Sequence, residues 1–267
     1  MCKFLSLSRS QFQTWKRFEM TSQGKSDAEL LPVVTSIFHR HRRRYGSRRI
    51  VAELNSQGIC CGRERVSKLM RNAGLKAISP KSFKPRTTES RHRLGYSPNL
   101  LLDLAEPSRP HRLWVGDISY IPVAEIGFGY LSVLMDRFTR RITGWSFRED
   151  MSEALTLGTL RKSIRSVQPC AGLIHHTDRG GQYAGTAYRS VLRRAQMEQS
   201  MSRAGDCYDN AFMESCFGTI KNELEMTEYK TVMQAASELA EYIHYYNHER
   251  RHSSLGYLTP TQFEAVA

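Results

Sequence analysis

Three short segments in the middle of the chain constrain its fold more than any other feature. They are LWVGDISYIPV, GYLSVLMDRF and RRITGWSF, which are rich in β-branched and aromatic residues and are separated by turn signals at residues 125–127 and 136–139. They predict three strands joined as a meander. Apolar spacing then predicts a helix over residues 152–167, a short strand over 172–175 and a helix over about 185–196. Strands first, followed by alternating helix and strand, indicate an α/β domain with a mixed sheet.

Helical and extended segments flank this domain. Residues 30–78 carry apolar residues at one-face spacing and are broken at Gly58 and Gly74, a pattern typical of a helix-turn-helix module. Residues 79–110 are rich in proline, serine and arginine, so we expect a mostly extended linker there. The expected parts are an N-terminal segment at 1–29, the helix-turn-helix-like domain at 30–78, the basic linker at 79–110, the α/β core at 111–228, and a C-terminal helix with a basic tail at 229–267.

Positive charge is concentrated at the N-terminal end of the chain. The net charge is +13, and residues 1–100 contain 21 Lys and Arg against 6 Asp and Glu. This asymmetry favours a module that binds a nucleic acid over a basic face that only aids solubility. The run HRHRRRYGSRR at residues 39–49 supplies charge that neutralises phosphates, and NHERRHSSLGY at 247–257 is either a capped helix end or a second strip in contact with DNA. The expected DNA contacts are Arg42, Arg43, Arg44, Arg48, Arg49, Arg250 and Arg251.

Several other classes of protein are disfavoured by the sequence. No apolar run approaches the roughly 18 residues of a membrane span, and the N-terminus lacks the apolar stretch and cleavage site of a signal peptide, so we expect a cytoplasmic protein. The six cysteines show neither a disulfide framework nor paired zinc spacing, and we interpret them as reduced thiols. No G-x-S-x-G segment occurs, which argues against a serine nucleophile.

Three carboxylates lie in or beside segments that are predicted to be buried. Asp117 lies in the middle of a segment apolar enough to be a central strand buried on both faces. Asp178 follows the next predicted strand, at the end where α/β sheets bind ligands. Glu214 borders the apolar stripe of a helix predicted over 207–224, and Lys221 returns to the same face of that helix seven residues later. A buried carboxylate is costly unless it is paired or holds a metal.

A fold that brings these elements together can place the three acids at one point. Clustered carboxylates repel one another and take up protons unless a cation neutralises them, so the cluster predicts a bound metal. All-oxygen ligands indicate Mg²⁺ or Mn²⁺, and two such ions stabilise the attacking and leaving oxygens of a phosphoryl displacement. Together with the basic N-terminal end, this predicts phosphodiester chemistry on double-stranded DNA, with Lys221 holding the backbone. A DNA-binding regulator without catalysis and a nuclease that only hydrolyses remain as alternatives.

Four nearby polar residues compete for a role or support it. His176 is a candidate supporting residue. A catalytic role for it is disfavoured, because metal-activated water needs no histidine base. Asn210 lies one helical turn before Glu214 and is a candidate to orient it or to contact DNA. Asp136 lies in the predicted turn DRFTR, where aspartate commonly bonds its own backbone, and Asp209 is better explained as a helix cap.

Three sequence blocks also carry a family resemblance. WVGDISY, HHTDRGGQY and SMSRAGDCYDNAFMESCFGTIKNELE resemble the catalytic blocks of DDE transposases of the retroviral-integrase superfamily, and 35 residues separate Asp178 from Glu214, as in the superfamily's D,D-35-E arrangement. The stretch from RRRYGSRRI to RVSKLMRNAGLKA resembles the helix-turn-helix segment of bacterial IS-three family transposases. YNHERRHSSLGYLTPTQFE resembles their C-terminal end, so the resemblance runs from about Ser6 to the end of the chain.

This resemblance implies an RNase H-like catalytic domain that acts on the ends of an insertion sequence. It implies that Asp117, Asp178 and Glu214 bind two Mg²⁺ or Mn²⁺ ions, with Asp117 bridging the pair. It further implies nicking at the terminal repeats and joining of the freed 3′-hydroxyl to target DNA by a homo-oligomer assembled on DNA. Members of the family are typically made as the second of two overlapping frames, which implies an upstream-frame product as partner or fusion.

The sequence departs from the family pattern at three positions. Ser119 stands in place of a usual threonine, Gly181 in place of a serine, and Cys216 in place of an aromatic residue. All three acids and Lys221 are kept, so the departures do not predict an inactive enzyme. The small Cys216 side chain is expected to loosen packing behind Glu214.

Overall fold

The computed structural model describes residues 22–79, 95–102, 104–203, 211–225 and 228–267, with the backbone alone at 22–25. The chain divides into two compact units, Met1–Ile78 and Ser79–Ala267. Asp209 and Asn210 lie outside the described residues, so the roles expected for them have no structural counterpart here. Within the described ranges no helix has both the length and the apolar character needed to cross a membrane.

The described part of the first unit contains three helices around a small apolar core. They are α2 (Ser22–Arg40), α3 (Ser47–Ser56) and α4 (Arg63–Asn72). The helices end near Gly58 and Gly74, which adopt positive φ values of 79° and 69° and so provide the turns expected there. The helical region begins at Ser22, earlier than the expected boundary at residue 30. The core is formed by Leu30, Val34, Ile37, Phe38, Tyr45, Ile50, Leu54, Val66, Leu69 and Met70.

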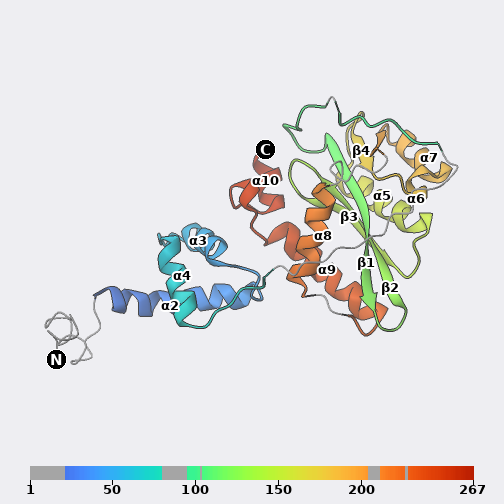
Figure 1. Ribbon diagram of the computed structural model, residues 1–267. Helices are drawn as coiled ribbons and strands as arrows, with labels where there is room; N and C mark the ends of the chain where they lie inside the picture. The colour runs from blue at the N-terminus through green and yellow to red at the C-terminus, as the bar shows by residue number, and fades with distance from the viewer. Residues whose placement is uncertain (1–21, 80–94, 103, 204–210, 226–227) are drawn as a thin grey trace, which may run out of the picture. The chain divides into compact units, whose positions relative to one another are not determined.

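The second unit is built on a five-stranded mixed sheet (Figure 1). The strands are β1 (Leu113–Val123), β2 (Gly127–Asp136), β3 (Ile142–Arg148), β4 (Ile174–Thr177) and β5 (Glu198–Met201), in the spatial order β3-β2-β1-β4-β5. The first three strands pair antiparallel, which confirms the predicted meander, whereas β4 and β5 run parallel to β1. The longest strand, β1, therefore occupies the centre of the sheet.

Helices cover both faces of this sheet (Figure 1). On one face α5 (Glu153–Val167), α6 (Gly181–Ala184) and α7 (Thr186–Arg194) enclose a core that includes Trp114 and Leu134 of the sheet. On the other face α8 (Ala211–Glu223) contacts β1, and α9 (Val232–His248) contacts β1 and β3. The predicted helices at 152–167, 185–196 and in the C-terminal part therefore form, with boundaries shifted by a few residues, and the described part of the helix predicted at 207–224 is helical over Ala211–Glu223.

Three features of the second unit differ from expectation. The sequence analysis did not predict β5 or the C-terminal helix α10 (Pro260–Val266), which follows the short 3-10 helix η2 (Ser253–Leu255). The last part of the expected linker packs on the sheet: the Leu100 amide donates to Ser200 Oγ at 2.9 Å, and the Met201 amide donates to the Pro98 carbonyl. The C-terminal segment is likewise integrated, because α10 packs on α9.

Candidate active site

Asp117 lies on the central strand β1, on the sheet face turned toward α8. Side chains alternate along a strand, and both Trp114 and Ile118 pack into the core beneath α5 and α7. The neighbouring Asp117 therefore points to the opposite face, where α8 contacts the strand. Its Oδ1 accepts a hydrogen bond from the Ile118 amide at 2.8 Å, and the residue keeps part of its surface exposed. The carboxylate predicted in a buried strand is thus held at the centre of the sheet.

Asp178 lies beside Asp117 because of the parallel pairing of β1 and β4. Gly116 pairs with Thr177, and the residue that follows each of them in the chain is one of the two aspartates. β4 ends at Thr177, and Asp178 begins the loop that follows. Its Oδ1 accepts a hydrogen bond from the Gly180 amide at 2.9 Å, which orders the loop around the carboxylate. The expected position at the end of a buried strand is confirmed.

The helix α8 brings Glu214 and Lys221 to the same side. At about 100° per residue, the seven-residue spacing returns Lys221 to the face of Glu214. Met213, Phe217 and Ile220 of the same helix are buried, whereas Glu214 is exposed and Lys221 is partly exposed. The buried stripe fixes α8 to the domain and leaves the glutamate and the lysine at its edge.

The charges of Asp178, Glu214 and Lys221 all act on the Asp117 carboxyl. Burial of its carboxyl and repulsion by Asp178 and Glu214 raise the pKa of Asp117 to about 8, while the Ile118 amide and Lys221 act in the opposite direction. Burial lowers the pKa of Lys221, and Asp117 counteracts that shift. A divalent cation would relieve this repulsion, and three carboxylates are the oxygen donor set that Mg²⁺ and Mn²⁺ prefer. The donor chemistry of the residues present therefore fits the predicted metal.

The three acids are near one another but are not arranged as a closed metal site. Among the described residues, no group of three His, Cys, Asp or Glu side chains has the geometry of a metal centre. Of the two acidic neighbours, Asp178 perturbs Asp117 more strongly than Glu214 does. The pairing of β1 with β4 therefore carries most of the site's geometry.

His176 supports the strand that precedes Asp178. It is fully buried, with Nδ1 at 2.8 Å from Ser200 Oγ and Nε2 at 3.0 Å from Ser202 Oγ. Both ring nitrogens are therefore engaged by hydroxyls, on β5 and just beyond it. This placement ties β4 to β5 and leaves the ring no contact with a substrate.

A tyrosine to which the sequence analysis gave no role also adjoins the site. Tyr183 on α6 is buried, and the charges of Asp178 and Asp117 contribute, after burial, to raising the pKa of its phenol. It stands at the end of the quoted block HHTDRGGQY, five residues after Asp178. In the sequence Tyr183 resembles an ordinary core residue, and it is distinguished only in the structure, by its nearness to Asp178 and Asp117.

The rival acid Asp136 has the structural role expected of a turn aspartate. It is fully buried, and its Oδ1 accepts hydrogen bonds from the Thr139 amide at 2.7 Å and the Thr139 hydroxyl at 2.9 Å. Its Oδ2 accepts a hydrogen bond from the His111 amide at 2.8 Å. These three donors satisfy the carboxylate without a metal or a substrate.

The basic run of the first unit forms the connection between α2 and α3. Arg42 and Arg43 are exposed and adopt positive φ values of 48° and 63°, and Arg48 is exposed on α3. Arg49 is partly exposed, and its guanidinium lies 5.6 Å from the ring centroid of Tyr45. Arg44 is different, because only 9% of its surface is exposed. The expectation that Arg44 contacts DNA from the surface conflicts with this burial.

The placement of Arg250 corrects the expectation that it contacts DNA. Its side chain is 6% exposed, and its Nε and Nη2 donate hydrogen bonds to both oxygens of Glu223 at 2.8–3.0 Å. The run of charged residues near the chain end predicted that Arg250 is exposed to solvent, but its side chain is buried against Glu223 on α8. Arg251 is partly exposed, and its Nη1 donates to the Tyr257 carbonyl at 3.0 Å.

The sequence analysis missed another set of exposed cations in the first unit. Arg63, Lys68 and Arg71 lie exposed on α4, the helix that follows the Gly58 turn. In a helix-turn-helix the second helix of the motif enters the major groove. The spacing of these cations at about three to five residues on a predicted helix was the signal available in the sequence.

Comparisons with known proteins agree with this architecture. Models of the integrase core domain match residues 107–207 and 195–260, and a model of an HTH-like domain matches residues 25–83. The chain is 39% identical over 265 residues to a 31 kDa protein of insertion element IS600 from Shigella sonnei, covering 98% of this chain and 97% of that protein. It is 36% identical to transposase InsF of insertion sequence IS3A from Escherichia coli K12, covering 99% and 92%.

Among solved structures, the catalytic core domain of HTLV-2 integrase in complex with magnesium aligns with a TM-score of 0.48 and 15% identity, covering 59% of this chain and 98% of that one. The matches to the integrase core and the mixed five-stranded sheet confirm the expected RNase H-like α/β fold behind a helical N-terminal unit. An HTH-like domain ahead of an integrase core makes DNA the partner. The chain belongs to the insertion-sequence transposases with an integrase core, enzymes that cleave DNA and transfer its strands.

Proposed function

We propose that Asp117, Asp178 and Glu214 are the catalytic acids of this transposase and hold two divalent ions, Mg²⁺ or Mn²⁺. The observation that carries this assignment is the register of β1 and β4, which sets Asp117 beside Asp178. Burial, together with the charge of Asp178, raises the pKa of Asp117 to about 8. Two metal ions supply charge stabilisation for the attacking and leaving oxygens of an in-line displacement. The protein's part is to hold the oxygen ligands in place.

The surrounding residues position the acids and the DNA. The Gly180 amide and the Ile118 amide fix the Asp178 and Asp117 carboxylates, and the buried stripe of α8 fixes Glu214. Lys221, on the face of Glu214, holds the DNA backbone next to the reacting phosphate. An ammonium serves there as a compact charge that follows the backbone without reading the sequence.

The DNA-binding surface of the first unit comprises two groups of cations. Arg42, Arg43, Arg48 and Arg49 bind phosphates from the connection between α2 and α3, as exposed arginines on a basic run do. Arg63, Lys68 and Arg71 on α4 bind along the groove that this helix enters. Arg251 is a further contact in the second unit, whereas Arg44 and Arg250 act inside their units.

The active assembly brings two DNA ends together. Joining requires that both ends of the element be held at once, so the working form is a homo-oligomer on the terminal repeats, with an upstream-frame product as partner or fusion. The setting that belongs to this proposal is the nucleoid in the bacterial cytoplasm, and the bacterial origin of the relatives supports it.

A strand cleavage assay tests the proposal. The substrate is an end-labelled duplex that carries the element's own terminal repeat, incubated with Mg²⁺ or with EDTA, with and without the upstream-frame product. We expect metal-dependent nicks and joined strands with the wild type and none with Asp117→Asn, Asp178→Asn or Glu214→Gln. Glu241→Gln, a change at an exposed position on α9, is the matched control and keeps activity. Binding without any metal-dependent product would favour a regulator, and nicks without joined strands would favour a nuclease.

A further inference from the structure

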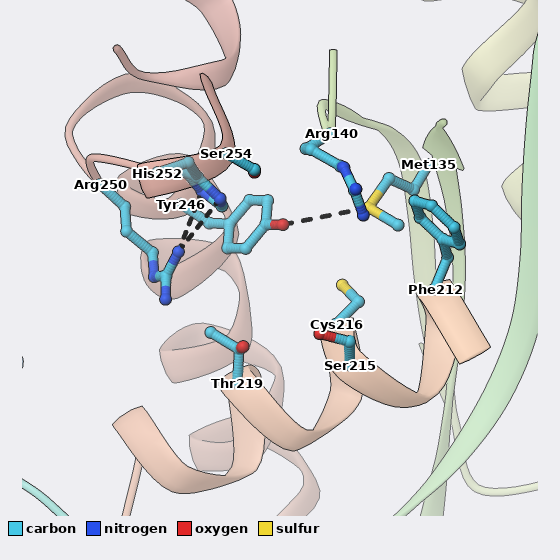
Figure 2. A pocket seen from close by; sticks show the side chains of 10 residues that line it. All are labelled: Met135, Arg140, Phe212, Ser215, Cys216, Thr219, Tyr246, Arg250, His252 and Ser254. Atoms are coloured by element: carbon cyan, nitrogen blue, oxygen red, sulfur yellow. Dashed lines mark hydrogen bonds between the residues drawn. The ribbon is translucent and has the colours of Figure 1, made fainter. Parts of the chain in front are cut away.

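A pocket of about 260 Å³ lies beside α8 and is lined in part by side chains of that helix (Figure 2). Phe212, Cys216 and Thr219 face it from α8 at positions i, i+4 and i+7, and the helical rotation of about 100° per residue puts Glu214 on the opposite side. The opposite wall comes from Tyr246 of α9, the segment after it and the β2–β3 connection. The complete lining is Met135, Arg140, Phe212, Ser215, Cys216, Thr219, Tyr246, Arg250, His252 and Ser254.

The lining of this pocket is basic and hydroxyl-rich. It contains the side chains of Arg140, Arg250 and His252, together with hydroxyls of Ser215, Thr219 and Ser254, and no carboxylate. The charge of Arg250 is balanced by Glu223, which lies outside the lining. The Arg140 guanidinium makes no direct hydrogen bond or ion pair with a carboxylate among the described residues, and Glu106, the partner of Arg137, acts on it only as a neighbouring charge. The pocket therefore presents one guanidinium without a directly bonded carboxylate, with hydroxyl groups around it.

The Arg140 guanidinium is held in place by its surroundings. It lies 4.0 Å from the ring centroid of Phe212, and the Arg137 guanidinium lies 4.3 Å from the same centroid. Two guanidinium groups on one ring repel each other. Burial, with Arg137 contributing, lowers the pKa of Arg140, while Tyr246 and Glu106 act in the opposite direction. Arg137 is paired with Glu106. An anion next to Arg140 would relieve the remaining repulsion.

The backbone around Arg140 is also fixed. The turn is anchored by Asp136, which is fully buried and accepts two hydrogen bonds from Thr139. Arg140 itself adopts a φ of 62°, in the left-handed region that non-glycine residues seldom occupy. Backbone strain of this kind persists where the surrounding structure enforces it, and it is concentrated at binding and active sites. The hydrogen-bonded turn thus holds the Arg140 side chain directed into the pocket (Figure 2).

We propose that this pocket binds a phosphate group of the DNA backbone, with the Arg140 guanidinium as its principal ligand and the hydroxyls of Ser215, Thr219 and Ser254 as further donors. The planar fork of an arginine matches phosphate oxygens with two parallel hydrogen bonds. The pocket lies on the helix that carries Glu214, so a strand held there is fixed relative to that acid. This inference rests on the proposed function, because DNA as the source of the phosphate follows from the transposase activity.

The salt dependence of DNA binding tests the proposal. Fluorescence anisotropy of a labelled duplex, recorded with the full chain in EDTA over a range of NaCl concentrations, gives the slope of log K against log salt. Each phosphate contact contributes about 0.9 to that slope. We expect Arg140→Gln to lower the slope by about 0.9 and Arg140→Lys to preserve it. Arg165→Gln removes an exposed arginine on α5 and is the matched control, with an unchanged slope expected.

A second variant blocks the pocket without removing the charge. An engineered cavity of about 150 Å³ admits a benzene ring, so a pocket of 260 Å³ has room for the phenyl group of Cys216→Phe. We expect this variant to lower the slope as Arg140→Gln does, and the double variant to lower it no further. It also keeps the test decisive if Arg140→Gln does not fold, which circular dichroism establishes.

Three results would overturn the inference. Unchanged slopes in both single variants would show that no DNA phosphate occupies the pocket. A rise in the melting temperature of the wild type with inorganic phosphate, absent from Arg140→Gln and accompanied by unchanged DNA slopes, would assign the pocket to a free phosphate. Additive losses in the double variant would show that the two residues act at different places. Because binding is measured in EDTA, a failure of metal-dependent cleavage would count against the proposed function and leave this inference standing.

Discussion

The buried ion pair between Arg250 and Glu223 is expected to be the strongest single electrostatic anchor of α8. The two side chains are 6% and 10% exposed, and the Arg250 guanidinium binds both carboxylate oxygens of Glu223. The Tyr242 hydroxyl donates a further hydrogen bond to Glu223 at 3.0 Å. The pair joins the C-terminal turn of the helix that carries Glu214 to the segment just after α9.

Removing one partner leaves a charge buried without its counter-ion. Such a loss costs about 3–5 kcal/mol, so Arg250→Met is expected to lower the free energy of unfolding by about that amount. For a domain of this size each 1 kcal/mol lowers the melting temperature by about 2–4 °C, which gives a fall of about 6–20 °C. The double variant Arg250→Met with Glu223→Leu is expected to lose less than the sum of the single variants, because neither charge is then stranded.

Urea denaturation followed by circular dichroism measures these differences. The matched control is Arg148→Met, because the pair between Arg148 and Asp150 is solvent-exposed, with 49% of each side chain accessible. An exposed pair contributes about 0–1 kcal/mol. The reasoning is refuted if Arg250→Met costs no more than Arg148→Met, or if the double variant is additive.

Three further predictions follow from other parts of the molecule. Gly144→Ala would place a Cβ 2.1 Å from Ser163 Oγ, so we expect a loss of about 1–3 kcal/mol by urea denaturation, whereas Gly218→Ala meets nothing within 4 Å and is expected to cost nothing. Burial lowers the pKa of His175 to about 3, below its ordinary value of 6.5, so the unfolded chain binds the proton first and stability falls as pH drops through that window, by at most about 1.4 kcal/mol per pH unit. The urea midpoint of the wild type should therefore fall further between pH 7 and pH 5 than that of His175→Gln, and equal shifts in the two proteins would contradict this. Mg²⁺ is expected to raise the melting temperature of the wild type and not that of Asp117→Asn, because only the intact carboxylate set binds the ion; an equal rise in both proteins would remove Asp117 from the metal site.

The centre of the fold follows from local patterns in the sequence. The strand β1 spans the residues of LWVGDISYIPV, and its place at the centre of the sheet agrees with a segment apolar enough to be buried on both faces. The two aspartates are recognisable because a carboxylate in or just after such a strand is costly. Their side-by-side arrangement depends on the parallel pairing of β1 with β4, which the residues of neither strand specify alone.

Features that depend on distant partners could not be read in the same way. The strand β5 has the sequence EQSM, which is too short and polar to signal a strand, and it forms because β4 offers it a parallel edge. Arg250 reads as part of a basic tail, and only Glu223, 27 residues earlier, draws it into the interior. The same reasoning applies to the last residues of the expected linker, because residues 98–100 form hydrogen bonds with β5, a strand that the sequence did not signal.

Strand joining by variants of the three acids tests the central claim most directly. A pre-nicked duplex with a free 3′-hydroxyl at the element's end separates joining from the first cut, and the joined product is quantified on a denaturing gel with Mg²⁺ or EDTA. The account predicts that the wild type and Glu241→Gln give joined product in Mg²⁺ and none in EDTA. In Mg²⁺, each of Asp117→Asn, Asp178→Asn and Glu214→Gln is expected to give less product by a factor on the order of 10² or more. Joined product from any of the three acid variants at the wild-type rate would contradict it.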